Sequence, residues 1–146
     1  MRVVKSVRLV ALGVLFAMAL SSVALAAEKI GVIEPQKILF QHPKFEQVTK
    51  RVQAVLEAKQ NEAKSAIEKA TDNKVKAEIY ATKKQEAAVE EQTLMAPLFK
   101  EINLAIRTVA KAKGVTVILD KAQVFFGGID VTEDVIQQLK KMNASN

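Results

Sequence analysis

The chain has 146 residues, with 22 lysines and arginines against 16 aspartates and glutamates, one histidine and no cysteine. The lack of cysteine excludes disulfides, zinc–thiolate sites, iron–sulfur clusters and thiol catalysis, and this length suits one domain. Three cationic residues lie in an N-terminal segment with the features of a targeting sequence, and without that segment the net charge falls from +6 to +3. We therefore expect no nucleic-acid partner, and no cofactor is indicated.

The first 26 residues have the pattern of a secretory signal peptide. A positively charged start precedes an uncharged apolar run at residues 9–20, and residues 24–26 (ALA) supply the small residues that a signal peptidase reads. The alternative is a membrane anchor, but twelve helical residues span only about 18 Å, well short of the ~30 Å hydrocarbon core. We predict that residues 1–26 are removed on export.

The next segment predicts one strand and one short helix. Residues 27–34 contain several β-branched residues and predict a strand that Pro35 ends. Residues 36–41 predict a helical turn. His42 and Pro43 predict a break, because proline disfavours helical geometry at the residue before it. Pro43 also suits the first position of the following helix.

Residues 44–113 predict an antiparallel helical hairpin. They lack glycine, are rich in strong helix formers, and place apolar residues at three- and four-residue steps. Residues 71–73 (TDN) are the predicted turn, which gives arms of close to thirty residues or more and a reach of roughly 40 Å. Many seam positions hold alanine, so the outer part of the hairpin should be weakly held. Pro97 predicts a kink near Thr93 or, alternatively, a division into two helices.

The pattern changes back to short strands after the hairpin. Gly114 suits the left-handed residue that follows a helix. Residues 115–119 predict a buried strand, residues 120–123 a turn, residues 124–126 a second strand, and residues 127–128 a further turn.

The last segment predicts a C-terminal helix. Residues 129–131 predict a short extended piece, after which Thr132 should cap the helix with its side chain. Residues 143–146 should be frayed. The expected apolar face of the helix consists of Val135, Ile136 and Leu139.

The strand-containing parts lie at opposite ends of the exported chain and should form one body. Residues 27–43 and 114–146 together make a unit that is small for independent stability without disulfides or metal, and apolar strands with open edges invite pairing with another subunit. We therefore predict an α+β protein in which a small β-rich oligomerisation body carries a long antiparallel α-helical coiled-coil hairpin at residues 44–113. The residues expected in the oligomer body are Ile30, Val32, Val117, Leu119, Val124, Phe125 and Phe126.

Both ends of the exported chain resemble the Skp/OmpH family. The sequence KIGVIEPQKILFQHP (residues 29–43) is similar to the opening strand and short helix of that family, and VTVILDKAQVFFGGIDVTEDVIQQLKK (residues 115–141) is similar to its C-terminal signature. The resemblance implies a periplasmic homotrimer with a β-rich hub and three projecting helical hairpins. It also implies an ATP-independent holdase chaperone that binds unfolded outer-membrane proteins until they reach the assembly machinery. An association with lipopolysaccharide and anionic membrane surfaces follows from the same resemblance.

The outer hairpin is rich in lysine. Residues 59–84 carry seven lysines against four acidic residues, a net charge of +3, which would attract anionic clients, lipid headgroups or lipopolysaccharide phosphates. The alternative is an ordinary solvated helix surface with mixed charges. The candidate binding residues are Lys59, Lys64, Lys69, Lys74, Lys76, Lys83 and Lys84.

No residue pattern indicates catalysis. His42 has no serine partner in a recognisable nucleophile motif, and one histidine does not suggest a metal site. The hypotheses are therefore a holdase chaperone, an exported structural coiled coil, or a protein that binds anionic lipid or lipopolysaccharide. An enzyme comes last.

Overall fold

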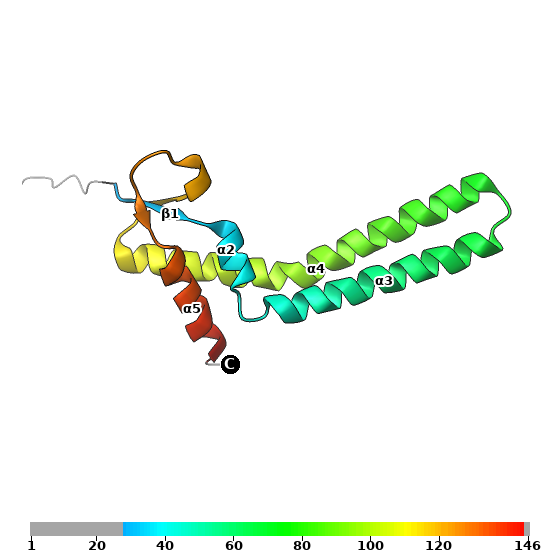
Figure 1. The fold of residues 1–146 in the computed structure, drawn as a ribbon, viewed down its shortest axis with the longest axis horizontal. Helices are drawn as coiled ribbons and strands as arrows, with labels where there is room; N and C mark the ends of the chain where they lie inside the picture. The colour runs from blue at the N-terminus through cyan, green and yellow to red at the C-terminus, as the bar shows by residue number, and fades with distance from the viewer. Residues whose placement is uncertain (1–27, 145–146) are drawn as a thin grey trace, which may run out of the picture.

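The computed structural model describes residues 28–144, and the predicted signal peptide lies outside them. A small body at one end carries a long helical hairpin that projects away from it (Figure 1). The protein is therefore an α+β protein made of a body and an arm, as predicted. The elements are β1 (Ile30–Ile33), α2 (Pro35–Phe40), α3 (Phe45–Lys69), α4 (Asn73–Lys113), β2 (Val117–Asp120), the 3₁₀ turn η1 (Lys121–Gln123), β3 (Ile129–Asp130) and α5 (Thr132–Ala144).

The two ends of the described chain meet in a three-stranded sheet, because β1 pairs with β2 and β3. The strand order is β2-β1-β3, and β1 runs parallel to both neighbours. Val32 of β1 is in register with Leu119 on one side and with Asp130 on the other. Parallel neighbours require a crossover connection, and the whole helical hairpin serves as the crossover between β1 and β2. The arm is thus an insertion into the body.

The core of the body lies between the sheet, α2, α5 and the end of α4 that follows Pro97. Ile38 of α2 and Ala105 of α4 are fully buried there. The predicted apolar face of the last helix is confirmed, since its three residues are all fully buried: Val135, Ile136 and Leu139. This burial fixes the base of the arm to the body.

Two predictions about the last helix are wrong. Thr132 does not cap its own helix: its Oγ1 accepts a hydrogen bond from the backbone N–H of Glu34 at 3.0 Å, 98 residues earlier. Asp130 supplies the local contact instead, because its Oδ1 accepts from the Thr132 N–H at 3.0 Å. The helix also continues to Ala144, and Asn143 is held by hydrogen bonds rather than frayed. The other two residues of the predicted frayed end, 145–146, lie outside the described residues.

The predicted second strand at residues 124–126 is also wrong. These residues follow η1 as an irregular loop in which the Phe125 and Phe126 side chains are fully exposed. Both edges of β1 are occupied by β2 and β3, and residues 124–126 pair with no strand among residues 28–144. Gly128 lies at φ +89°, and an added Cβ would lie 2.8 Å from Val32 Cγ1, so the chain needs glycine for the turn that leads into β3.

The hairpin itself is confirmed, with differences at its ends. The first helix has 25 residues and the second has 41, so α3 is shorter than expected. The first helix begins at Phe45, and Pro43 lies in the preceding turn rather than at its first position. At the tip, Asp72 Oδ1 accepts from the backbone N–H groups of Lys74 at 2.6 Å and Val75 at 3.3 Å, which caps α4.

Pro97 does not divide the second helix. The helix is continuous through Pro97, so the two-helix alternative is wrong. Figure 1 shows α4 changing direction in its yellow-green part, as the missing hydrogen bond of a proline requires. The helix then ends at Gly114 in the predicted left-handed conformation, with φ 66° and ψ 29°. Within residues 28–144, every helix is too short or too polar to span a bilayer.

Candidate functional site

Among the described residues, large apolar side chains are buried in the seam of the arm only near its base. Val48 and Val52 of α3 and Leu98 of α4 are buried together, and Leu94 and Met95 pack against them. Farther out, the buried seam residues are Ala63 and Ala87. An alanine methyl contributes about 0.8 kcal/mol on burial, against roughly 1.5–3 for a larger apolar side chain. The weakly held outer seam predicted from alanine content is therefore present.

Ion pairs join the two helices where the apolar seam is weakest. Lys59 Nζ on α3 lies 3.2 Å from Glu86 Oε2 and 3.1 Å from Glu90 Oε1 on α4. Lys83 Nζ on α4 lies 2.9 Å from Glu62 Oε2 on α3 and 2.9 Å from Glu86 Oε2. We call these five residues the charge clasp.

The clasp changes the titration of its members. Hydrogen bonds from Lys83 and then Lys59 lower the pKa of Glu86, and a hydrogen bond from Lys83 is the main cause that lowers the pKa of Glu62. Hydrogen bonds to Glu90 and Glu86 raise the pKa of Lys59. The charged forms of Glu62, Glu86 and Lys59 are therefore favoured at neutral pH.

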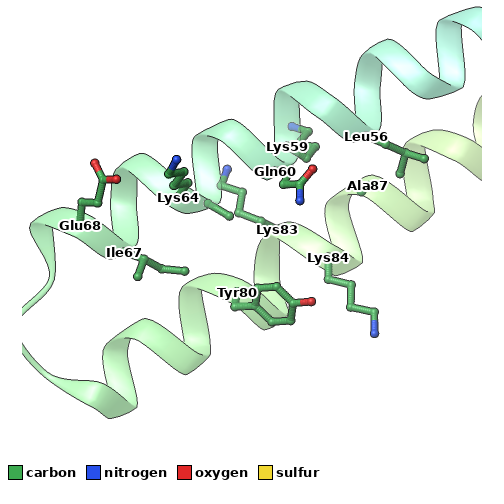
Figure 2. Close-up of a pocket in the computed structure, with 11 residues that line it drawn as sticks. Leu56, Lys59, Gln60, Lys64, Ile67, Glu68, Tyr80, Lys83, Lys84 and Ala87 are labelled. Atoms are coloured by element: carbon green, nitrogen blue, oxygen red, sulfur yellow. The ribbon is translucent and has the colours of Figure 1, made fainter.

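A groove lies beside the clasp, between the two helices of the outer arm. Its volume is about 530 Å³. In Figure 2, Ile67 extends from α3 toward α4, Lys83 extends from α4 toward α3, and Lys84 points away from α3. The groove combines apolar walls with amine groups. Its lining residues are Leu56, Lys59, Gln60, Ala63, Lys64, Ile67, Glu68, Tyr80, Lys83, Lys84 and Ala87.

The groove belongs to a wider set of exposed apolar side chains on the arm. Tyr80 is 60% exposed, and Val75 and Val89 on the same helix are also exposed. Leu94 and Met95 instead pack in the base of the seam. The outer arm therefore presents apolar side chains to solvent at several separate points, an arrangement suited to many weak contacts with an extended partner.

The seven lysines predicted as binding residues divide into two groups. Lys59 and Lys83 belong to the clasp, so their charges are neutralised by neighbouring glutamates. The others make no ion pair with any residue in the described range 28–144, and four of them are exposed while Lys76 is half-buried. This second group, which we call the free tip lysines, consists of Lys64, Lys69, Lys74, Lys76 and Lys84.

The sequence did not reveal the clasp. Glu86 and Glu90 lie outside residues 59–84, and their partner Lys59 is on the other helix. The usable signal was the number of residues on each side of the turn, because an antiparallel hairpin with a turn at residues 70–72 places residue 59 close to the level of residues 83–86.

The residues predicted for the oligomer body lie in different environments. Val32 is buried within the chain's own core, and Val124 is half-buried. Five others expose a large part of their side chains in the absence of a partner chain. These are Ile30, Val117, Leu119, Phe125 and Phe126.

The described residues hold no evident reaction centre. Across residues 28–144, no three acidic or histidine side chains gather in a way that could hold a metal ion. His42 is buried against Glu101 rather than beside a hydroxyl nucleophile. The groove on the outer arm presents mainly apolar side chains and lysine amines, with one amide and one carboxylate among its lining residues.

The geometry defines a class of protein: a small α+β body with an inserted helical hairpin arm. The sequence profile of the outer membrane protein (OmpH-like) family matches residues 69–139, just under half of the chain. This segment is similar to the OmpH-like family, and the resemblance stated from the sequence is confirmed. The similarity supports a chaperone role.

One solved structure is similar to the chain. A crystal structure from Caulobacter crescentus CB15, described as a candidate OmpH-like outer membrane chaperone, is 20% identical with a TM-score of 0.42 and covers 80% of this chain and 86% of that chain. None of the curated protein sequences compared with the chain gives a significant match.

Proposed function

We propose that the protein is an ATP-independent holdase chaperone of the periplasm that binds unfolded outer-membrane proteins and delivers them for membrane assembly. The observation that carries this proposal is the outer arm, which projects from the body and exposes an apolar groove of about 530 Å³ bordered by lysines. The OmpH-like sequence of residues 69–139 supports the same role. Binding without chemistry is consistent with a groove that is lined mainly by lysines and apolar side chains.

Weak, distributed contacts suit a holdase. An unfolded membrane protein exposes many apolar side chains, and each can be partly covered by the groove or by a single exposed residue such as Val75 or Val89. Individual contacts of this kind give little affinity, but several together give substantial avidity. Release then needs no energy source, because each contact is weak.

We also propose that the body forms the hub of a homotrimer. In a single chain, the side chains of Phe125 and Phe126 are exposed to solvent. The outer edges of β2 and β3 have no strand partner among residues 28–144. Burial of large exposed aromatic side chains is a strong driving force for association. Three arms around one hub would enclose a space for a client.

An aggregation assay tests the holdase proposal. A urea-unfolded outer-membrane β-barrel protein is diluted into buffer without ATP, light scattering is followed, and the mass of the chaperone is measured in the same buffer. We expect suppression of scattering and a trimer mass. Tyr80→Ser should weaken the suppression, whereas Leu104→Ser, which changes a similarly exposed residue of α4 outside the groove, should not. Unchanged scattering with the intact protein would reject the proposal in favour of a structural coiled coil.

A second candidate function is binding to anionic lipid or lipopolysaccharide. The free tip lysines favour it, because they carry positive charge without an acidic partner among residues 28–144. Long-range attraction to an anionic surface falls as salt screens the charges. Binding to anionic vesicles that is lost in high salt, without any effect on aggregation, would select this function.

A further inference from the structure

A buried polar cluster joins the arm to the body. His42 lies in the loop between α2 and α3 and is only 3% exposed. Its Nδ1 accepts a hydrogen bond from the backbone N–H of Lys44 at 3.1 Å. This contact sets the path of the chain at the point where it leaves the body and enters the arm.

Two further helices contribute to the same cluster. Glu101 of α4 places Oε2 at 3.3 Å from His42 Nε2 and Oε1 at 2.7 Å from Lys44 Nζ. Asn143 of α5 donates from Nδ2 to Glu101 Oε2 at 2.9 Å and to the Leu139 carbonyl at 2.9 Å. The loop that begins the arm, the base of α4 and the last helix of the body therefore meet at Glu101. We call His42, Lys44, Glu101 and Asn143 the junction cluster.

The hydrogen bonds determine the protonation state of the ring. Because Nδ1 accepts from a backbone N–H, it carries a lone pair, and the imidazole is neutral with its proton on Nε2, which faces Glu101. Protonation of Nδ1 would place its N–H against the backbone N–H of Lys44, and Nδ1 could then no longer accept that hydrogen bond. The neutral ring therefore fits the junction, and the doubly protonated ring does not.

We propose that His42 makes the junction between arm and body sensitive to pH, so that the neutral ring holds the base of the arm and protonation releases the loop at residues 41–44. The loss of the His42–Lys44 contact would free the start of α3 while the apolar core keeps α4 attached to the body. The arm would then be more mobile relative to the body in mild acid. This inference concerns the junction alone and does not depend on client binding.

The charges around the ring set the direction of the effect. Burial lowers the pKa of His42 from its ordinary value of 6.5, the charge of Glu101 opposes this, and the charge of Lys44 lowers the pKa further. Among residues 28–144, the charged groups that face the ring are Glu101 from α4 and Lys44 from its own loop, and α5 contributes the neutral Asn143. Although burial alone would raise the pKa of Glu101, hydrogen bonds from Lys44 and Asn143 lower it, so Glu101 stays ionised in mild acid.

The sign of the stability change follows from the lowered histidine pKa. The folded junction binds a proton less readily than a histidine in the unfolded chain does. The contribution of neutral His42 to the free energy of unfolding is therefore complete above pH 6.5, and it is lost as the pH falls below that value. The pKa values of Glu62, Glu86 and Glu101 are lowered from 4.5, so these carboxylates stay charged between pH 7.5 and 5.5.

The single histidine allows a direct test on the intact, untagged protein. The NMR signal of the ring Cε1–H is assigned without ambiguity because the chain has one histidine, and its shift is followed from pH 8 to pH 5. We expect a midpoint below 6.5, and Glu101→Gln should move it to lower pH by removing the charge that favours the protonated ring. A wild-type midpoint at or above 6.5 would overturn the proposal.

A matched variant tests the consequence for stability. His42→Asn places an amide oxygen near the position of Nδ1 and cannot titrate in this range. The urea midpoint of the wild type should fall between pH 7.5 and 5.5 by more than that of the variant. An equal fall in both proteins would contradict the proposal, and the NMR midpoint decides the matter on the wild type alone if the variant does not fold.

Discussion

The amine of Lys59 lies 3.2 Å from the carboxylate of Glu86 on the opposite helix of the arm. This pair lies in the part of the arm where the buried seam consists of alanines such as Ala63 and Ala87. Charge pairs at a protein surface are screened by salt and are individually weak. The outer arm should therefore separate and re-form more readily than its base, which would let the groove adapt to different clients.

Removal of Lys59 should loosen the outer arm. Lys59→Gln deletes the α3 amine that faces Glu86 and Glu90, and we expect faster hydrogen exchange of backbone amides around both sides of the clasp. Lys64→Gln is the matched control, because Lys64 is an exposed lysine of the same helix with no ion pair in the described range. Equal exchange in the two variants would show that the clasp contributes nothing to arm stability.

The clasp should also weaken in acid. The pKa values of Glu62 and Glu86 are lowered from 4.5 by their lysine partners. A lowered carboxyl pKa contributes stability that is present above the unfolded value and is lost as the pH falls through the folded value. We expect carboxyl ¹³C titration midpoints below 4.5 for both residues and faster amide exchange in the outer arm below that pH. Midpoints at or above 4.5 would mean that the pairs are absent in solution.

The base of the arm should depend on Leu98. This side chain is almost fully buried against Val48 and Val52, so Leu98→Ala should cost about 2–5 kcal/mol of unfolding free energy. Leu104→Ala on the exposed face of the same helix should change stability by no more than about 0.5 kcal/mol. Urea denaturation of the two variants measures the difference. A cost below 1 kcal/mol for Leu98→Ala would show that the seam is not packed.

The fold class and the hairpin could be predicted because their signals are local. The turn between α3 and α4, the left-handed Gly114 and the apolar face of α5 each depend on a few neighbouring residues. The strand at residues 124–126 was predicted on the same grounds and is wrong, because these residues form an irregular loop that pairs with no strand among residues 28–144. Local β propensity contains no information about which segments pair.

The charge clasp and the junction cluster could not be predicted because they depend on contacts between distant segments. Glu101 lies 57 residues from Lys44 and 42 residues from Asn143. The burial of His42 depends on how α2, α4 and α5 pack together, which no local pattern around residue 42 contains. A lysine count over residues 59–84 likewise cannot tell the paired Lys59 from the exposed Lys64.

The stability of the body should depend on the hydroxyl of Thr132. It is 98% buried and accepts the hydrogen bond from the Glu34 N–H, which ties β1 to the start of α5. Thr132→Val keeps the shape but leaves that donor without a partner, at a cost of about 1–3 kcal/mol. Thr132→Ser keeps the hydroxyl and should lose less. Chemical denaturation ranks the two variants, and a valine variant as stable as the wild type would mean that the contact adds nothing.

Site-specific crosslinking tests whether the outer arm contacts the client. The chain lacks cysteine, so Tyr80→Cys and Leu104→Cys each introduce a single attachment point for a photo-crosslinker, one at the groove and one on α4 outside it. With an unfolded outer-membrane protein present, we expect strong crosslinking from position 80 and little from position 104. Crosslinking that is absent at position 80, or no stronger there than at position 104, would contradict the proposed binding of clients by the outer arm.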